Sequence, residues 1–280
     1  MIKIGANVSI AKTGLLAAVE ETVSYRANTF MIYTRSNRGG KARPIEQFNR
    51  EKAYELMKEH DIVDPVVHAP YLINLASPKE DTWEYGIDLL REDIRRTSYL
   101  GIRYVVFHPG SHVGEGIPYG IKRIAEGLNA ILTGEEDVFV CLETMAGDGS
   151  KVGNRFEEIA EIISLVKYKE KLGVCGDTCH LYSAGYDIVN DFEGVMKEFD
   201  DIIGLDRLKV FHINDSKTPF NSRKDRHENI GKGSIGGEAI RRIVHHEVLR
   251  DMPCILETPE GRYKEEIAYI RGEIEEPSYL

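Results

Sequence analysis

The side chains best suited to chemistry in this sequence stand at the ends of its short apolar runs. Six runs rich in Val, Ile, Leu and Phe each finish on a histidine or an acidic residue. These residues are His68, His108, Glu143, Asp177, His212 and Glu257. Such a side chain at the end of a buried strand costs free energy unless a partner compensates it. Metal cations would do so, and we therefore predict a metal site built from several strand ends.

Three more potential ligands accompany this set. His180 follows Asp177 by three residues, and Asp225 and His227 stand two apart, so that the latter pair projects to one side of an extended backbone. Asp225 and His227 belong to a long polar segment, and loops of that length are usually functional or disordered. We predict a His-Asp-His site beside the first cluster.

The nine residues together indicate the kind and the number of ions. Five His, two Asp and two Glu offer imidazole and carboxylate donors, which suit zinc or manganese better than copper or iron–sulfur clusters. A catalytic zinc ion takes three protein ligands, so nine ligands predict three ions, with one carboxylate able to bridge two of them. Cys179 lies between Asp177 and His180 and could touch a metal ion, but no CxxC pair accompanies it, so a small buried side chain is the favoured interpretation.

The spacing of these residues indicates the elements that position them. The six strand-end residues follow one another at intervals of 34 to 45 residues, the length of one strand, one helix and two turns, and eight such units fill the 280 residues. Strands are predicted at 2–9, 29–34, 65–70, 104–110, 139–144, 173–178, 209–215 and 253–259. Helical patterns separate them, as in the stripe of Trp83, Ile87, Leu90 and Ile94. We predict an α/β fold of the (β/α)8 TIM-barrel type, whose active sites lie at the carboxyl ends of the strands.

Composition favours one domain over residues 1–280, because 42% of the residues are hydrophobic and no Pro-, Gly- or Ser-rich linker divides the chain. The start, MIKIGANVSI, is too short and too polar for a signal peptide, and nowhere do 18 apolar residues run together. We expect a cytoplasmic protein without a membrane partner. The four cysteines are expected to be reduced and mostly buried.

The formal net charge of −10 argues against a nucleic-acid partner, because neutralisation of phosphates supplies most of the non-specific affinity for DNA. Three divalent cations would reduce this charge to about −4. Basic residues also cluster in two predicted loops, with Arg35, Arg38, Lys41 and Arg43 in one and Arg223, Lys224 and Arg226 in the other. Each cluster is either a contact for DNA or a solvated loop, and the sequence leaves both interpretations open.

Six motifs are distributed along the chain: GANVS, HAPYLINL, HPGSH, LETMAGDGSKVG, GVCGDTCHLYSAGYD, and HINDSK followed by SRKDRHENIGKGSIG. Over nearly its whole length the chain thereby resembles the endonuclease IV family of apurinic/apyrimidinic endonucleases. All nine ligand positions of the family are filled by the residue type that the family uses. Asn7, in GANVS, departs from the pattern, because the family more often has a histidine there.

The resemblance implies a TIM barrel with three zinc ions, manganese being an alternative at some sites. The implied ligand sets are His68, His108 and Glu143 for one ion, Glu143, Asp177, His212 and Glu257 for the second, and His180, Asp225 and His227 for the third. Glu143 would be the bridging carboxylate and the catalytic residue, which orients the attacking water and accepts its proton.

The implied reaction is hydrolysis of the phosphodiester on the 5′ side of an abasic site in double-stranded DNA. It leaves a 3′-hydroxyl and a 5′-deoxyribose phosphate, and a 3′-repair diesterase activity is also expected. In the family, residues that match Arg38, Tyr71 and Leu72 enter the DNA stack at the lesion. The alternative for Tyr71 and Leu72 is that they pack the mouth of the barrel.

Two other functions compete with this interpretation. A single-metal sugar isomerase or epimerase of the same barrel type would use Glu143, Asp177, His212 and Glu257, but would leave the other five ligands without a role. A non-catalytic lesion binder or metal-storage protein would have no need for a bridging carboxylate. We expect a monomer, because no predicted helix has an exposed apolar face.

Overall fold

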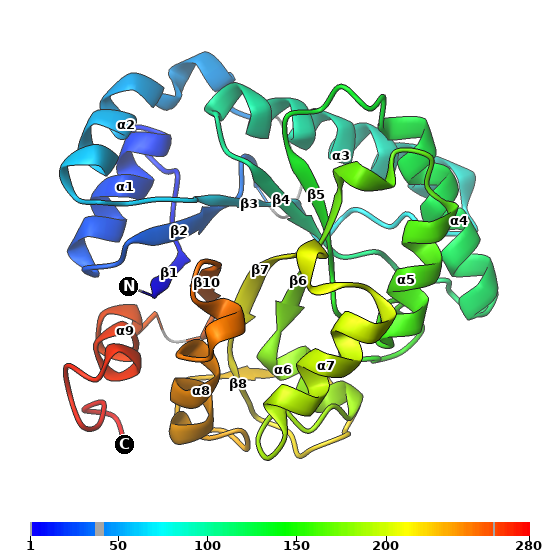
Figure 1. The fold of residues 1–280 in the computed structure, drawn as a ribbon. Helices are drawn as coiled ribbons and strands as arrows, with labels where there is room; N and C mark the ends of the chain where they lie inside the picture. The colour runs from blue at the N-terminus through cyan, green and yellow to red at the C-terminus, as the bar shows by residue number, and fades with distance from the viewer. Residues whose placement is uncertain (1, 37–41, 260) are drawn as a thin grey trace.

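The computed structural model describes residues 2–36, 42–259 and 261–280, and in these ranges eight parallel strands close into a barrel (Figure 1). The barrel strands are β1 (Lys3–Asn7), β2 (Thr29–Ile32), β3 (Val66–His68), β4 (Tyr104–Phe107), β5 (Phe139–Glu143), β6 (Leu172–Asp177), β7 (Leu208–Ile213) and β10 (Pro253–Leu256). Successive strands are neighbours, and β10 closes on β1 through the pairs Lys3↔Pro253 and Gly5↔Ile255. The predicted TIM barrel is confirmed.

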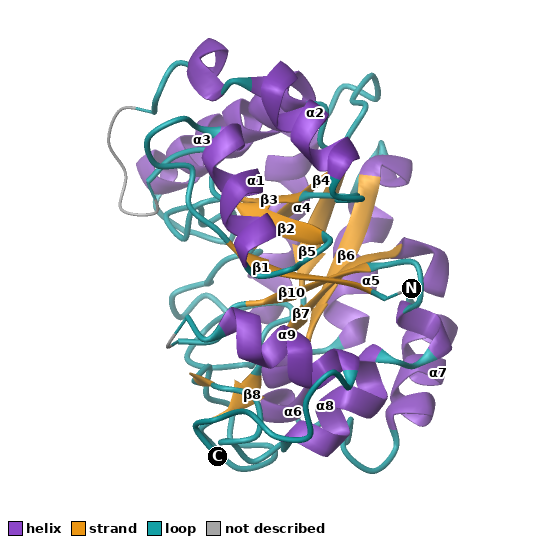
Figure 2. Ribbon diagram, turned by 90° about the vertical axis from the view of Figure 1, so that its left-hand side faces the viewer, coloured by secondary structure: helices purple, strands orange, loops and turns teal. Residues whose placement is uncertain are grey.

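Helices alternate with the strands and surround the barrel (Figure 2). The α-helices are α1 (Leu15–Ser24), α2 (Arg50–Glu59), α3 (Glu80–Leu100), α4 (Ile117–Ile131), α5 (Phe156–Leu165), α6 (Thr178–Ala184), α7 (Phe192–Ile202), α8 (Gly237–Val244) and α9 (Tyr263–Arg271). Short 3-10 helices are η1 (Ile45–Phe48), η2 (Lys169–Lys171), η3 (Leu205–Arg207) and η4 (Glu247–Leu249). In the predicted apolar stripe of α3, Ile87, Leu90 and Ile94 are buried and Trp83 is partly buried. No helix in the described ranges is long and apolar enough to span a lipid bilayer.

Each predicted strand coincides with an observed one, but most of the observed strands are shorter. The strand predicted over 104–110 ends at Phe107, and the strand predicted over 65–70 ends at His68. The residues beyond these points leave the sheet and form the loops at its carboxyl edge. In Figure 2 these loops gather on the left side of the barrel.

The interior of the barrel is arranged in layers, because side chains along a strand alternate between its two faces. One inward-facing layer is wholly apolar and inaccessible to solvent, and consists of Met31, Val66, Val106, Cys141, Cys175, Val210 and Ile255. Two residues further along six of these strands stand the predicted ligands His68, His108, Glu143, Asp177, His212 and Glu257. The apolar layer therefore forms a dry floor beneath the candidate site.

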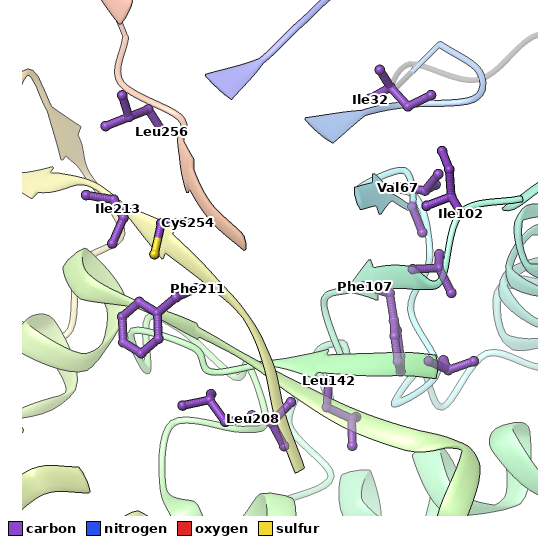
Figure 3. Close-up of a cluster of buried hydrophobic side chains, with 14 of the residues drawn as sticks. Ile32, Val67, Ile102, Phe107, Leu142, Leu208, Phe211, Ile213, Cys254 and Leu256 are labelled. Carbon is purple, nitrogen blue, oxygen red and sulfur yellow. The ribbon is translucent and has the colours of Figure 1, made fainter. Parts of the chain in front are cut away.

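The opposite faces of the strands pack beneath the helices. Figure 3 shows this second layer, in which Phe107, Leu142, Phe211, Ile213 and Leu256 are among the buried side chains. All four cysteines are buried and free, as predicted. Burial raises the pKa of both Cys175 and Cys254 to about 12, so these thiols remain neutral at physiological pH.

The long polar segment after β7 is ordered by one carboxylate. It contains a two-stranded antiparallel ribbon of β8 (Asp215–Ser216) and β9 (His227–Glu228). Asp215 accepts hydrogen bonds from the backbone N–H groups of Gly231, Gly233 and Ile235 at 2.9 to 3.0 Å. A Cβ on Gly233 would lie 2.4 Å from the Asp215 Oδ1 atom, so only glycine fits there. The ribbon returns the chain over the barrel mouth, and this holds His227 near the strand ends.

Candidate metal centre

The nine predicted ligands form three groups at the carboxyl edge of the barrel. The first group comprises His68, His108 and Glu143. The Nε2 atoms of His68 and His108 lie 3.0 and 3.2 Å from the Oε2 atom of Glu143. Glu143 and His68 are each 1% exposed, so the cluster sits against the dry floor rather than in open solvent.

The second group shares Glu143 with the first. It comprises Glu143, Asp177, His212 and Glu257, whose ligand atoms lie within 4.8 Å of one another. The Nδ1 atom of His212 lies 3.1 Å from the Glu257 Oε2 atom and 3.3 Å from the Glu143 Oε1 atom. Glu143 therefore directs one carboxylate oxygen to each group, the geometry that a bridging ligand needs.

The third group comprises His180, Asp225 and His227. The Nε2 atoms of both histidines approach the Asp225 Oδ1 atom, at 3.3 Å for His180 and 3.4 Å for His227. Asp177 connects this group with the second, because its side chain caps α6 by accepting the backbone N–H of His180 at 2.8 Å. The start of α6 thereby fixes where His180 lies.

The donor atoms fit metal cations, because several are buried with no hydrogen-bond partner. Among the described residues, the Nε2 atoms of His180 and His227 are buried and have no hydrogen-bond partner. The His180 Nδ1 atom lies 2.7 Å from the Thr144 carbonyl, and the His68 Nδ1 atom lies 2.7 Å from the Ala69 carbonyl. Donation to these carbonyls leaves each Nε2 atom facing a carboxylate, so that either a proton or a metal cation must lie between the two.

The charges in this cluster keep the carboxylates ionised. Burial raises the pKa of Glu143, but the imidazoles of His108 and His212 outweigh it and hold that pKa well below its usual range. Burial likewise acts against ionisation of Glu257, yet His212 lowers the pKa of Glu257 to about 2. Burial lowers the pKa of His108. Burial acts in the same direction on His180, but Asp177 and Asp225 outweigh it and hold the pKa of His180 well above its usual range. The metal-free site thus presents anionic oxygens, and a metal ion that binds His180 displaces its proton.

Two residues that sequence reasoning missed also contact the centre. Asn214 donates from Nδ2 to the Asp177 Oδ2 atom at 2.8 Å and accepts the Glu257 backbone N–H at 3.1 Å, so it ties two ligand-bearing strand ends together. Tyr33 follows β2, and its hydroxyl donates to the Tyr71 hydroxyl at 3.1 Å. Burial strongly raises the pKa of Tyr33, which keeps it a neutral phenol. Asn214 had a signal in the sequence, since it follows His212 by two residues in HIND.

The predicted DNA-binding residues lie in two different situations. Tyr71 and Leu72 are 55% and 39% exposed, on the loop between β3 and α3, and the Tyr71 ring lies 5.0 Å from that of His108. Arg38 and Lys41 lie outside the described residues. Asn7, the departure from the family pattern, lines an open groove of about 610 Å³ together with Tyr33.

Some of the basic residues have structural roles instead. Arg35 is largely buried and pairs with Asp93, its Nε atom lying 3.1 Å from the Asp93 Oδ1 atom. Arg43 donates to the Lys12 carbonyl at 2.8 Å, and Arg226 donates to the Asp225 carbonyl at 2.6 Å. Asp93 therefore compensates the charge of Arg35, whereas hydrogen bonds to carbonyls leave the charges of Arg43 and Arg226 in place.

Comparison with known proteins identifies relatives that match most of this chain. A family model described as "Xylose isomerase-like TIM barrel" matches residues 19–273. A "Probable endonuclease 4" from Geobacillus sp. (strain WCH70) is 54% identical over 98% of this chain and 96% of its own length. The crystal structure of endonuclease IV from Thermus thermophilus superposes with a TM-score of 0.83 at 33% identity, covering 98% of this chain and 99% of that one. A D-tagatose 3-epimerase-like protein, with a TM-score of 0.71 at 20% identity over 97% and 96% of the two chains, is similar in fold alone.

Proposed function

This chain belongs to the endonuclease IV family of apurinic/apyrimidinic endonucleases, and from that membership we propose that it hydrolyses the phosphodiester 5′ to abasic sites in duplex DNA. The products are a 3′-hydroxyl and a 5′-deoxyribose phosphate. The observation that carries the proposal is the position of Glu143, whose two oxygens face two different ligand groups. We also propose a 3′-repair diesterase activity, because blocked 3′ ends carry the same phosphodiester beside a damaged sugar.

The residues that would hold the metal ions follow from the three groups. We assign three zinc ions, or manganese at some positions, to the sets His68, His108 and Glu143, then Glu143, Asp177, His212 and Glu257, and finally His180, Asp225 and His227. Bound divalent ions at this site supply Lewis acidity, which polarises the phosphodiester and makes a water molecule acidic enough to attack near neutral pH.

The chain's own residues supply orientation and proton acceptance. Glu143 stays ionised between the groups, and it orients the attacking water and accepts its proton. The carbonyls of Ala69 and Thr144 fix the tautomers of His68 and His180, so that each imidazole keeps its ligand orientation. The apolar floor excludes bulk water from below, which strengthens the electrostatic interactions in the site.

Recognition of a missing base is assigned to the exposed loops. Nothing remains at an abasic site for a protein to hydrogen-bond, so apolar wedges that enter the stack are the suitable readers. The high exposure of Tyr71 and Leu72 beside the first ligand group supports this role over packing in the barrel mouth. We also propose that Arg38 contacts the lesion, on the basis of the family motif.

We further propose one domain over residues 1–280 that acts as a monomer in the cytoplasm. The pairing of β1 with β10, the first and last strands of the described residues, supports a single domain, because one barrel includes both. The free cysteines and a DNA substrate support a reducing compartment.

A sugar epimerase is the second candidate, because the second ligand group alone would suffice for one metal ion and the fold is shared with a D-tagatose 3-epimerase-like protein. It gives the first and third groups no role. We therefore rank it below the nuclease.

The test is incubation of the purified metal-replete protein with an end-labelled duplex that carries one abasic analogue. Incision at the 5′ side of the lesion, absent from an undamaged duplex, is the expected result. Epimerisation of D-tagatose or D-fructose without incision of the duplex would transfer the assignment to sugars.

A further inference from the structure

Val113, in the loop between β4 and α4, combines two unfavourable properties. At 59% it is the most exposed of the large hydrophobic residues in the described chain. Its φ angle is +47°, and among the described non-glycine residues with positive φ it is the one with a β-branched side chain. The others are Lys12, Arg26, Asn49, Asp61, Asp64, Asn221 and Arg223. A β-branched residue in the left-handed region is a steric outlier, and such outliers gather at functional sites.

The turn that carries Val113 is held rigidly by its neighbours. The imidazole of His112 accepts the backbone N–H of Gly116 at 2.8 Å, and the His112 carbonyl accepts the N–H of Glu115 at 3.0 Å. The backbone N–H of His112 donates to the Ser150 carbonyl at 3.0 Å. Val113 is therefore kept in its strained conformation by hydrogen bonds on both sides, rather than placed there by a loose loop.

The same turn is joined to the loop that carries Tyr71 and Leu72. Asn74 accepts the N–H of Ser111 at 2.8 Å and donates to the Ser111 carbonyl at 3.1 Å. At Gly110, with φ +127°, an added Cβ would lie 2.3 Å from the Asn74 Oδ1 atom, so the two loops touch there. Tyr71, Leu72 and Val113 thus lie on two loops that contact each other, the β3–α3 loop and the β4–α4 loop. Both loops follow the carboxyl ends of neighbouring strands.

We propose that Val113 is a third apolar contact to the damaged duplex, which packs against the DNA beside the lesion. This inference rests on the proposed function. An apolar side chain gains free energy when DNA that is bent at the lesion covers it, whereas intact straight DNA offers it no comparable surface. The side chain is then already exposed, and its backbone already in the strained conformation, before DNA binds.

The test separates backbone strain from DNA contact with two substitutions, one that removes the apolar side chain and one that keeps it. Val113→Gly relieves the backbone strain and removes the apolar side chain, while Val113→Leu keeps the apolar character and the strain. Binding is measured by fluorescence anisotropy of a duplex with a tetrahydrofuran abasic analogue and an uncleavable methylphosphonate at the scissile position. Metal content and Tm are measured on the same samples. The matched control is Val63→Gly, because Val63 is 42% exposed and precedes β3 at the opposite end of the barrel.

For Val113→Gly we expect an unchanged or higher Tm, full metal content and a Kd for the abasic duplex weakened about tenfold. The loss should be equal at low and high salt, because no phosphate contact is removed. Val113→Leu should stay within about threefold of the unsubstituted protein, and Val63→Gly should not alter binding. Unchanged affinity in Val113→Gly, or an equal loss in Val113→Leu, would overturn the inference. Failure of the unsubstituted protein itself to bind would instead count against the proposed function.

Discussion

Glu143 lies where two ligand groups meet, and its environment explains why a carboxylate can be buried there. Its Oε2 atom faces His68 and His108, and its Oε1 atom faces His212. Burial alone would favour the protonated acid, but the imidazoles keep its pKa well below the usual range. One residue thereby supplies charge to both groups.

Replacement of Glu143 by Gln should keep the fold and lower the rate of incision at least about 10³-fold, because the amide supplies neither the bridging charge nor a proton acceptor. The rate is measured under single-turnover conditions on the abasic duplex, and metal content by elemental analysis. Glu55→Gln, at an exposed position on α2, is the control and should leave the rate unchanged.

A Glu143→Gln rate within about tenfold of the unsubstituted protein would remove Glu143 from its central role. Such a result would indicate Asp177 or Glu257, the other carboxylates of the second group, as the proton acceptor.

The clustering of the nine candidate ligands could be predicted from the sequence, because their types and their spacing carry the signal. Tyr33 and Val113 could not be assigned in the same way. The role of Tyr33 depends on a hydrogen bond to Tyr71 across two loops, and that of Val113 depends on a backbone angle. Neither property is periodic along the chain, so no pattern of residue types reveals it.

Helix α3 anchors the segment that follows β2 through a buried polar network. Asp93, fully buried on α3, accepts the Thr34 hydroxyl at 2.7 Å and pairs with Arg35. Arg96, one turn further on, donates to the carbonyls of Thr34 and Arg43, both at 2.9 Å. The network therefore holds both ends of the β2-to-η1 connection to one helix.

Asp93→Ala should lower the free energy of unfolding by about 3–5 kcal/mol, because it leaves the buried guanidinium of Arg35 without its charge partner. Urea denaturation followed by circular dichroism measures the change. Asp88→Ala, at an exposed ion pair with Arg91 on the same helix, should change it by less than about 0.5 kcal/mol. Equal effects of the two substitutions would show that the network adds no particular stability.

The barrel strands could be predicted because each is a short apolar run, and six of them lead into a polar ligand. The β8–β9 ribbon could not, since its two strands are only two residues long and contain Asp215, Ser216, His227 and Glu228. The contacts that order it run from Asp215 to backbone groups 16 to 20 residues away. Such long-range polar contacts leave no local pattern.

At the scale of the whole molecule, the barrel gathers buried ionisable groups at one end above a dry apolar layer. The carboxylates repel one another, and the buried Nε2 atoms of His180 and His227 lack hydrogen-bond partners. Bound cations would compensate both costs. Bound metal should therefore stabilise the entire fold as well as the chemistry.

Removal of metal by a chelator should lower the Tm by about 10 °C, because a ligand that binds only the folded chain stabilises it by mass action. Differential scanning calorimetry before and after chelation gives the shift. Zinc added back should restore it, and a Tm that does not respond to the chelator would argue against a metal centre that contributes to stability.

The most direct measurement of the central claim is a zinc titration of metal-free protein, with incision of the abasic duplex followed at each step. If the three groups, the first two of which share Glu143, form one catalytic centre, incision on the 5′ side should reach its full rate only as the third equivalent binds, and the product should carry a 3′-hydroxyl. Full incision at one equivalent, or none at three, would contradict the account.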